Sequence, residues 1–322
     1  MIDILTLVTP FFLVIGCGYL AGRIGLVETT ALKSLNSYLL YFALPGMFIS
    51  RLSDIDLAQA FDIRLLVAFV AGNFVIWLIS TVIQRGVFKN NLSETAAINT
   101  AAGWGNSGYM GIPLSVGLLG SIGLLHAFAL LAADILVLSA LAFVLHGLQS
   151  NGGRMDPLAL IREISKALFL NPFLLPFAIG GVISWYNLEP PTLLMDWAGM
   201  LGDSAFAVAL FTIGAGMALR PLVINRQSMG AVIPSTFLKL LIHPLVSGII
   251  AYVLGLDAIA IAGIVVLTAT PTATNAYILA NRFNVKEAEA AAIIFCTTTL
   301  SAFTLPLALY LLRDSLPGIA GG

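Results

Sequence analysis

Apolar residues in this chain gather into long runs that are separated by short polar connections. A transmembrane helix needs about 20 consecutive, mostly apolar residues. Ten runs reach or nearly reach that length, and they cover residues 4–22, 31–50, 63–84, 95–118, 121–146, 168–186, 192–218, 229–254, 258–281 and 288–312. The pattern predicts an all-α membrane protein with ten transmembrane helices.

Two of these runs are interrupted in matching places. The glycine-rich stretch 101–113 interrupts the fourth run, and the threonine-rich stretch 268–277 around Pro271 interrupts the ninth. Lipid cannot hydrogen-bond an unwound backbone, so a broken helix at membrane depth must face protein or a wet cavity. A pair of broken helices in corresponding positions of two halves is typical of a transporter binding site.

The two halves also share a short sequence repeat. Thr9-Pro10-Phe11-Phe12-Leu13 opens the first run, and Asn171-Pro172-Phe173-Leu174-Leu175 opens the sixth. Because each half holds five runs, the second half would enter the membrane from the opposite side, which predicts an inverted repeat. We expect a first repeat over 1–148, a cytoplasmic connection over 149–166 and a second repeat over 167–322.

Composition narrows the class of protein further. Hydrophobic residues make up 59% of the chain and charged residues 10%, and the net charge of −1 argues against a nucleic-acid partner. Cys17 and Cys296 both lie in apolar runs, where packing is the expected role. No spacing of His, Cys or Asp suggests a metal site, and no cofactor is expected.

Lysine and arginine set the expected orientation. One set of connections carries eleven of them and the opposite set three, which predicts by the positive-inside rule that the first set is cytoplasmic and both termini are outside. The first set is Arg23, Lys33, Arg85, Lys89, Arg154, Arg162, Lys166, Arg220, Arg226, Arg282 and Lys286, and the second is Arg51, Arg64 and Arg313.

Ionisable residues within membrane spans are functional candidates by default. Five lie well inside the runs: His126, Asp134, Asp203, Lys239 and His243. An apolar surrounding disfavours a charged carboxyl group, so Asp134 is a candidate proton carrier, or else a structural partner of Lys239. Lys239 could pair with Asp203 or Asp134, which would form a charge network, or attract an anionic substrate. For both histidines we expect packing or interfacial roles.

The interruptions supply polar groups without full charges. Gly105 permits close backbone approach, and Asn106 and Ser107 stand where a half-helix begins, so free N–H groups and an amide could bind a carboxylate. Asn106 could equally cap the half-helix. In the ninth run, Thr270, Thr272, Thr274 and Asn275 could contact substrate or only satisfy freed carbonyl groups. Pro113 and Pro271 are expected at the breaks, Pro113 as a kink.

Four separated motifs resemble the auxin efflux carrier family over essentially the whole chain. This family includes the plant PIN-formed auxin exporters and bacterial carriers of malonate or malate. The motifs are Asn106-x-x-x-Met110-Gly-Ile-Pro113, Pro271 through Asn284-Val285, Gly202-Asp203-Ser204 running into Ala209-Leu-Phe-Thr-Ile-Gly214, and Lys239-x-x-x-x-Pro244.

The resemblance implies ten helices in inverted five-helix repeats, as in bile-acid and sodium/proton antiporter folds. Helices 1, 2, 6 and 7 would form a dimerising scaffold, and helices 3–5 and 8–10 a mobile transport domain. Helices 4 and 9 would cross at their breaks, where Asn106 would meet the substrate carboxylate. Asp134 stands where plant members have an uncharged amide, and Gly105 and Ala276 stand where they have proline.

These observations predict an elevator-type secondary transporter of a small organic anion, a mono- or dicarboxylate, in the bacterial inner membrane. An ionised Asp134 would repel an anion, so we expect proton coupling, with one sodium ion as the alternative. A passive anion channel is a further alternative, because crossed broken helices can also line a pore. No HExxH or GxSxG motif supports an enzyme.

Overall fold

The structure is a computed structural model that describes residues 2–53, 55, 62–150, 154, 157–169, 174–219 and 226–312. These residues are helical apart from short connections, and they form one isolated β-bridge but no strand. Several residues used above lie outside the described ranges, namely Asn171, Pro172 and Phe173 of the repeat and the basic residues Arg220 and Arg313.

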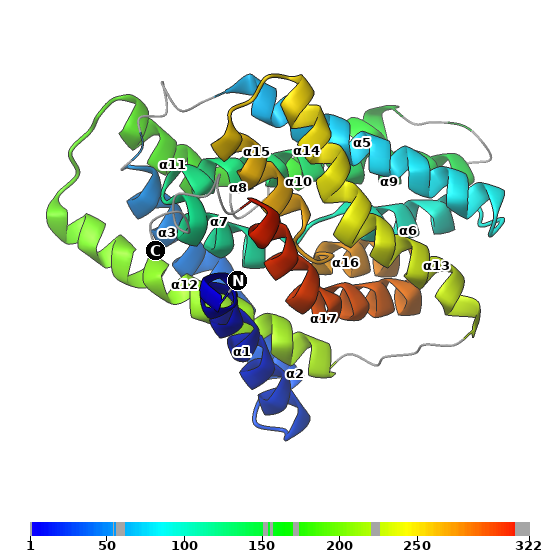
Figure 1. Cartoon of the computed structure of the whole chain (residues 1–322), viewed down its shortest axis with the longest axis horizontal. Helices are drawn as coiled ribbons and strands as arrows, with labels where there is room; N and C mark the ends of the chain where they lie inside the picture. Colours follow the sequence, from blue (N-terminus) through cyan, green and yellow to red (C-terminus); the bar gives the residue numbers. More distant parts are fainter. Residues whose placement is uncertain are drawn as a thin grey trace.

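Helices follow one another with short connections, and η marks a π-helical turn within a longer helix (Figure 1). The first part of the chain forms α1 (Ile2–Arg23), α2–η1–α3 (Thr29–Tyr38, Leu39–Ala43, Leu44–Leu52), α5 (Ile63–Gly86), α6 (Leu92–Gly103), η2–α7 (Ser107–Gly111, Ile112–Leu119) and α8–η3–α9 (Ile122–Ala133, Asp134–Ser139, Ala140–Ser150). The second part forms α10 (Pro157–Phe169), α11 (Leu174–Trp185), α12 (Thr192–Leu219), α13–η4–α14 (Arg226–Phe237, Leu238–Ile242, His243–Val253), α15 (Ala258–Thr268), α16 (Thr274–Phe283) and α17 (Glu287–Leu312).

Five helices of the described chain are long and apolar enough to cross a membrane. They are Ile63–Gly86, Ile122–Ser150, Thr192–Leu219, Ser228–Val253 and Glu287–Leu312. The all-helical membrane class is therefore confirmed, whereas the ten-helix inverted repeat stays a prediction. Within the predicted connection 149–166 the structure begins a further helix, α10, which the apolar runs did not indicate.

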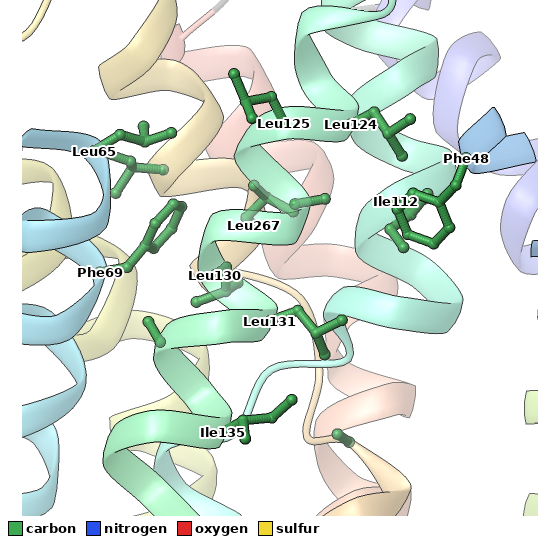
Figure 2. Close-up of a cluster of buried hydrophobic side chains, with 14 of the residues drawn as sticks. Phe48, Leu65, Phe69, Ile112, Leu124, Leu125, Leu130, Leu131, Ile135 and Leu267 are labelled. Atoms are coloured by element: carbon green, nitrogen blue, oxygen red, sulfur yellow. The ribbon is translucent and has the colours of Figure 1, made fainter. Parts of the chain in front are cut away.

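The largest core lies between α5, α8 and the two interrupted helices. Leu65 and Phe69 of α5 face Leu130 of α8, and Leu267 of α15 and Ile112 of α7 complete this packing (Figure 2). All five side chains are buried. The apolar cluster therefore holds together the elements that carry both breaks.

Prolines follow three of the four π-helical turns in the described residues. Pro45, Pro113 and Pro244 each stand at the second position of the α-helical segment that follows such a turn. Proline lacks an N–H group and clashes with the carbonyl group one turn earlier, so a local π-helical turn accommodates it without breaking the helix. The expectation that Pro113 marks a helix break is therefore wrong, because the helix runs from Ser107 through Leu119.

Candidate functional site

The two interruptions pair with each other through their backbones. Helix α6 ends at Gly103 and α15 at Thr268, and neither helix resumes until Ser107 and Thr274 respectively. Between these ends the Asn106 N–H donates to the Pro271 carbonyl at 2.8 Å, and the Ala273 N–H donates to the Trp104 carbonyl at 3.0 Å. Gly105 and Thr272 form an antiparallel bridge. Each break thus satisfies backbone groups of the other, as a non-aqueous surrounding requires.

Threonine hydroxyl groups satisfy further backbone groups at this crossing. The Thr272 hydroxyl donates to the Ala101 carbonyl at 2.8 Å, and the Thr272 N–H donates to the Thr297 hydroxyl at 3.1 Å. The Thr270 hydroxyl donates to the Leu267 carbonyl at 2.6 Å. Thr272 is 1% exposed. Its hydroxyl group is therefore hydrogen-bonded to the backbone, and Thr272 helps to hold the two broken segments together at the crossing.

An acidic and a basic side chain lie buried beside the crossing. Asp134 opens η3 and Lys239 lies in η4, and both are 0% exposed. The Asn73 amide of α5 donates to Asp134 Oδ1 at 2.8 Å. The Lys239 ammonium group donates to the Thr268 carbonyl at 2.7 Å, and its Nζ lies 3.2 Å from His243 Nδ1. A π-helical turn carries each charged residue, and such turns are frequent at functional sites.

Both charges act on the first break. Asp134 lies beside the Gly105 N–H and the Ser107 hydroxyl group, and it interacts through space with the Lys239 ammonium group. A Cβ atom added to Gly105 would lie 3.4 Å from Lys239 Nζ and 3.1 Å from Thr270 Oγ1. Glycine therefore leaves room for the Thr270 hydroxyl group against the unwound backbone, and Lys239 Nζ lies within contact range of the same position.

Several buried polar atoms around this pair have no hydrogen-bond partner within the described chain. They are Asp134 Oδ2, Asn73 Oδ1, His243 Nε2, Ser107 Oγ and Ser247 Oγ. Ser247 lies against Gly72 of α5, one residue before Asn73. Buried polar groups are normally satisfied, by protein or by ordered water. This cluster therefore has the capacity to bind water or to exchange a proton.

A cavity of about 240 Å³ lies directly beside the crossing. Its polar lining includes Asn106 and Ser107 from the first break and Thr274 and Asn275 from α16. The Asn106 side chain makes no capping hydrogen bond to the helix that it precedes. Apolar and aromatic residues complete the lining, namely Leu40, Trp104, Tyr109, Leu131, Ala273 and Ile278. Figure 2 shows the two extended segments passing Leu131.

The structure brings most of the predicted site residues together. Gly105, Asn106, Ser107 and Asn275 line one cavity, and Asp134 lies behind it with Lys239. Asn73 was not among the predicted site residues, because only ionisable side chains within the spans were taken as candidates. An amide in the middle of the apolar run 63–84 was the available signal.

Asp203 lies elsewhere, and the expectation that it could neutralise Lys239 is wrong. It forms an ion pair with Arg51 at 3.1 Å, and the side chains of the two residues are 70% and 45% exposed respectively. The neighbouring Gly202 packs against Met47 of α3. Successive helical residues point about 100° apart, so burial of Gly202 turns Asp203 outward.

Comparison with known proteins identifies the family of the chain. Residues 3–309 match the family model described as membrane transport protein. The chain is 30% identical over 320 residues to a Rhizobium meliloti (strain 1021) protein named "Putative malonate transporter", covering 98% of this chain and 97% of that protein. It is 26% identical over 294 residues to an "Uncharacterized transporter" of Methanothermobacter thermautotrophicus, covering 90% of this chain and 92% of that protein. The chain therefore belongs to the membrane transport protein family, that of the auxin efflux carriers, and is a membrane transporter and not an enzyme.

Proposed function

We propose that this protein is a proton-coupled secondary transporter of a small organic anion, and that it binds the anion at the crossing of its two broken helices. The observation that carries the proposal is the cavity that Asn106 lines in front of the buried Asp134 and Lys239. A small dicarboxylate such as malonate is the first substrate to test, because a relative carries that name.

Recognition of a carboxylate would use neutral donors in the cavity. The helix η2–α7 begins at Ser107, and the positive end of its dipole favours an anion. The Asn106 amide stands at this end with no capping bond, and Asn275 faces the same cavity from α16. A volume of about 240 Å³ is below the range of about 300–1,000 Å³ that is typical of drug-sized ligands. The cavity therefore favours a compact anion.

Coupling would use the protonation state of Asp134. When Asp134 is ionised, it neutralises Lys239 and opposes a second anion nearby. When Asp134 takes up a proton, the Lys239 charge is left without a counter-charge and attracts an anion to the break. A sodium ion at Asp134 would meet repulsion from Lys239, so the pair favours a proton over the alternative of sodium.

Alternating access requires that the site be closed toward one side of the membrane while it is open toward the other. The cavity lies on the side of α16, whose far end carries Arg282, a residue of the predicted cytoplasmic set. On the side of α7 and α8, Phe128 stacks on Phe177 of α11 with ring centroids 3.4 Å apart, and both rings pack against Phe48 of α3. We assign this conformation as inward-facing, with the three rings closing the outer side.

An elevator mechanism divides the molecule into a fixed scaffold and a moving part that carries the substrate site. Helices α1, α2–α3, α11 and α12 would form the scaffold, and the remaining spans, which carry the crossing, would move. Dimerisation through the scaffold, a bacterial inner membrane and external termini complete the proposal. Phe48 and Phe177 of the scaffold meet Phe128 of the moving part, which makes this contact one of those that must separate.

Uptake by purified protein in liposomes tests the proposal. We expect labelled malonate to enter with saturable kinetics, to show counterflow exchange, and to accumulate when a pH gradient is imposed without sodium. Accumulation that requires sodium would replace the proton with the alternative ion. Non-saturable flux without exchange would identify a channel, and absence of any malonate flux would refute malonate as a substrate.

A further inference from the structure

The charges around the cavity are too few for a ligand with two negative charges. None of the cavity-lining side chains carries a charge at neutral pH. Lys239 supplies one positive charge from behind Gly105, and Asp134 cancels that charge whenever it is ionised. The site can therefore offer a net charge of zero or plus one.

Basic residues near the far end of α16, beyond the cavity lining, do not change this count. At the end of α16, Arg282 pairs with Glu163 of α10 at 2.6 Å. Lys286 lies 3.7 Å from Glu94 and 3.3 Å from Glu289. Glu163 also pairs with Lys166, so three carboxylates in this group face three cations, and the group as a whole offers no unmatched positive charge to a second carboxylate of the ligand.

Other titratable groups on the helices packed around Asp134 face away from the cavity. His126 of α8 lies against Gly263 of α15, and His146 of α9 stacks on Phe283 at 3.9 Å. His243 contacts Lys239 and does not line the cavity. On α10, Lys166 and Glu163 pair with each other at 3.4 Å, and Arg162 is exposed. Asp134 and Lys239 therefore set the charge of the site.

We infer that the protein carries its substrate as a monoanion together with one proton, in an electroneutral cycle. This inference rests on the proposed function. In the loaded site, neutral Asp134, the Lys239 cation and the ligand monoanion sum to zero. In the empty site, ionised Asp134 and the Lys239 cation also sum to zero. Both forms thus avoid moving net charge through a medium in which an uncompensated charge is strongly disfavoured.

A dicarboxylate would therefore enter as its singly protonated form. For malonate, one carboxylate would bind at Asn106, and the second carboxyl group would be protonated and need no cation. A dianion would leave one charge uncompensated beside a pair that has only one positive charge to offer. Monomethyl malonate carries one charge at any pH above the ionisation of its single acid group, which makes it a matched probe.

Competition against labelled malonate uptake separates the two ligand charge states. We expect the inhibition constant of malonate, relative to that of monomethyl malonate, to rise about tenfold from pH 6.5 to pH 7.5, since the monoanion fraction falls about tenfold per pH unit. Protonation of Asp134 cancels in this ratio because both ligands bind the same protein. A ratio that does not change with pH would overturn the inference, whereas absence of labelled malonate uptake would instead refute malonate as the substrate in the proposed function.

A membrane potential tests electroneutrality in the same liposomes. With potassium and valinomycin setting either zero or about 100 mV, we expect the pH-driven accumulation of malonate to be the same at both potentials. Movement of one net charge would change the accumulation about 50-fold at 100 mV. A change of that size would contradict an electroneutral cycle even if the monoanion is the bound form.

Discussion

Glycine permits close approach at two places in this protein, once between intact helices and once at the broken ones. Where α1 packs on α12, Gly18 and Gly214 let two unbroken helices approach until a side chain would strike the backbone of the other helix. At the crossing, Gly105 lets an unwound segment approach Lys239 and Thr270. The first contact involves only intact helices, whereas the second pairs two unwound backbone segments and buries two charges.

The difference separates a region built for rigidity from one built for ligand exchange. Close packing of intact helices leaves no polar group to satisfy, so α1 and α12 need no water or ligand between them. The crossing retains unpartnered polar atoms beside Asp134, and these have a use only if water, a proton or a substrate visits the site. Substitutions in the two regions should therefore differ in their effects on folding stability and on transport.

The largest effect is expected when the buried charge pair is broken. Lys239→Met leaves the Asp134 carboxyl group without its counter-charge, and we expect a loss of about 3–5 kcal/mol in folding stability near neutral pH, together with loss of transport. Asp134→Asn combined with Lys239→Met removes both charges and should regain most of the stability without regaining transport. Melting of the detergent-solubilised protein measures the first effect. A single substitution as stable as the wild type would show that the two charges are not coupled.

A smaller loss of stability is expected at the contact between α1 and α12. Gly214→Ala places a Cβ atom against the Ile15 carbonyl group and 2.7 Å from Tyr19 N, so the helices must separate, at about 1–3 kcal/mol. Gly199→Ala on the same helix meets no atom within 4 Å and should be neutral or slightly stabilising. Melting temperatures of the two variants provide the comparison. Equal values would mean that this contact is looser than described.

The Asn106 amide should affect binding without affecting folding. Asn106→Ala removes a donor to a charged ligand, which is worth about 1.5–3 kcal/mol, so malonate affinity should fall roughly 10- to 100-fold. Stability should change little because the side chain makes no capping bond. Titration of malonate against the purified protein gives the affinity. Unchanged affinity together with unchanged stability would assign Asn106 no part in the site.

The sequence predicted the location of the site better than its internal roles. Glycine-rich and proline-containing interruptions in two apolar runs are local signals, and they located the crossing. Which polar groups face the cavity depends on pairing between the segments, which sequence alone does not specify. For Thr272 the sequence left open substrate contact or satisfaction of a freed carbonyl group, and in the structure its hydroxyl group donates to the Ala101 carbonyl. Asn73 was not predicted as a site residue because an amide carries no charge. Helix rotation, which turns Asp203 outward, also depends on packing.

The smallest effect is expected at the exposed ion pair. Asp203→Asn removes the partner of Arg51, and exposed pairs contribute about 0.2–1 kcal/mol or nothing measurable. We therefore expect near-normal melting and near-normal malonate transport. Loss of transport in this variant would return Asp203 to the charge network. Because near-normal behaviour is expected, Asp203→Asn is a matched control for the same chemical change at Asp134.

Malonate flux through Asp134→Asn protein in liposomes tests the central claim most directly. An amide imitates a permanently protonated Asp134, so the loaded site stays neutral but the empty site keeps the uncompensated Lys239 charge and returns slowly. We predict that malonate exchange across the membrane persists, whereas accumulation driven by a pH gradient is lost, with Asp203→Asn behaving as the wild type. Accumulation by Asp134→Asn at the wild-type level would contradict the assignment of Asp134 as the proton carrier.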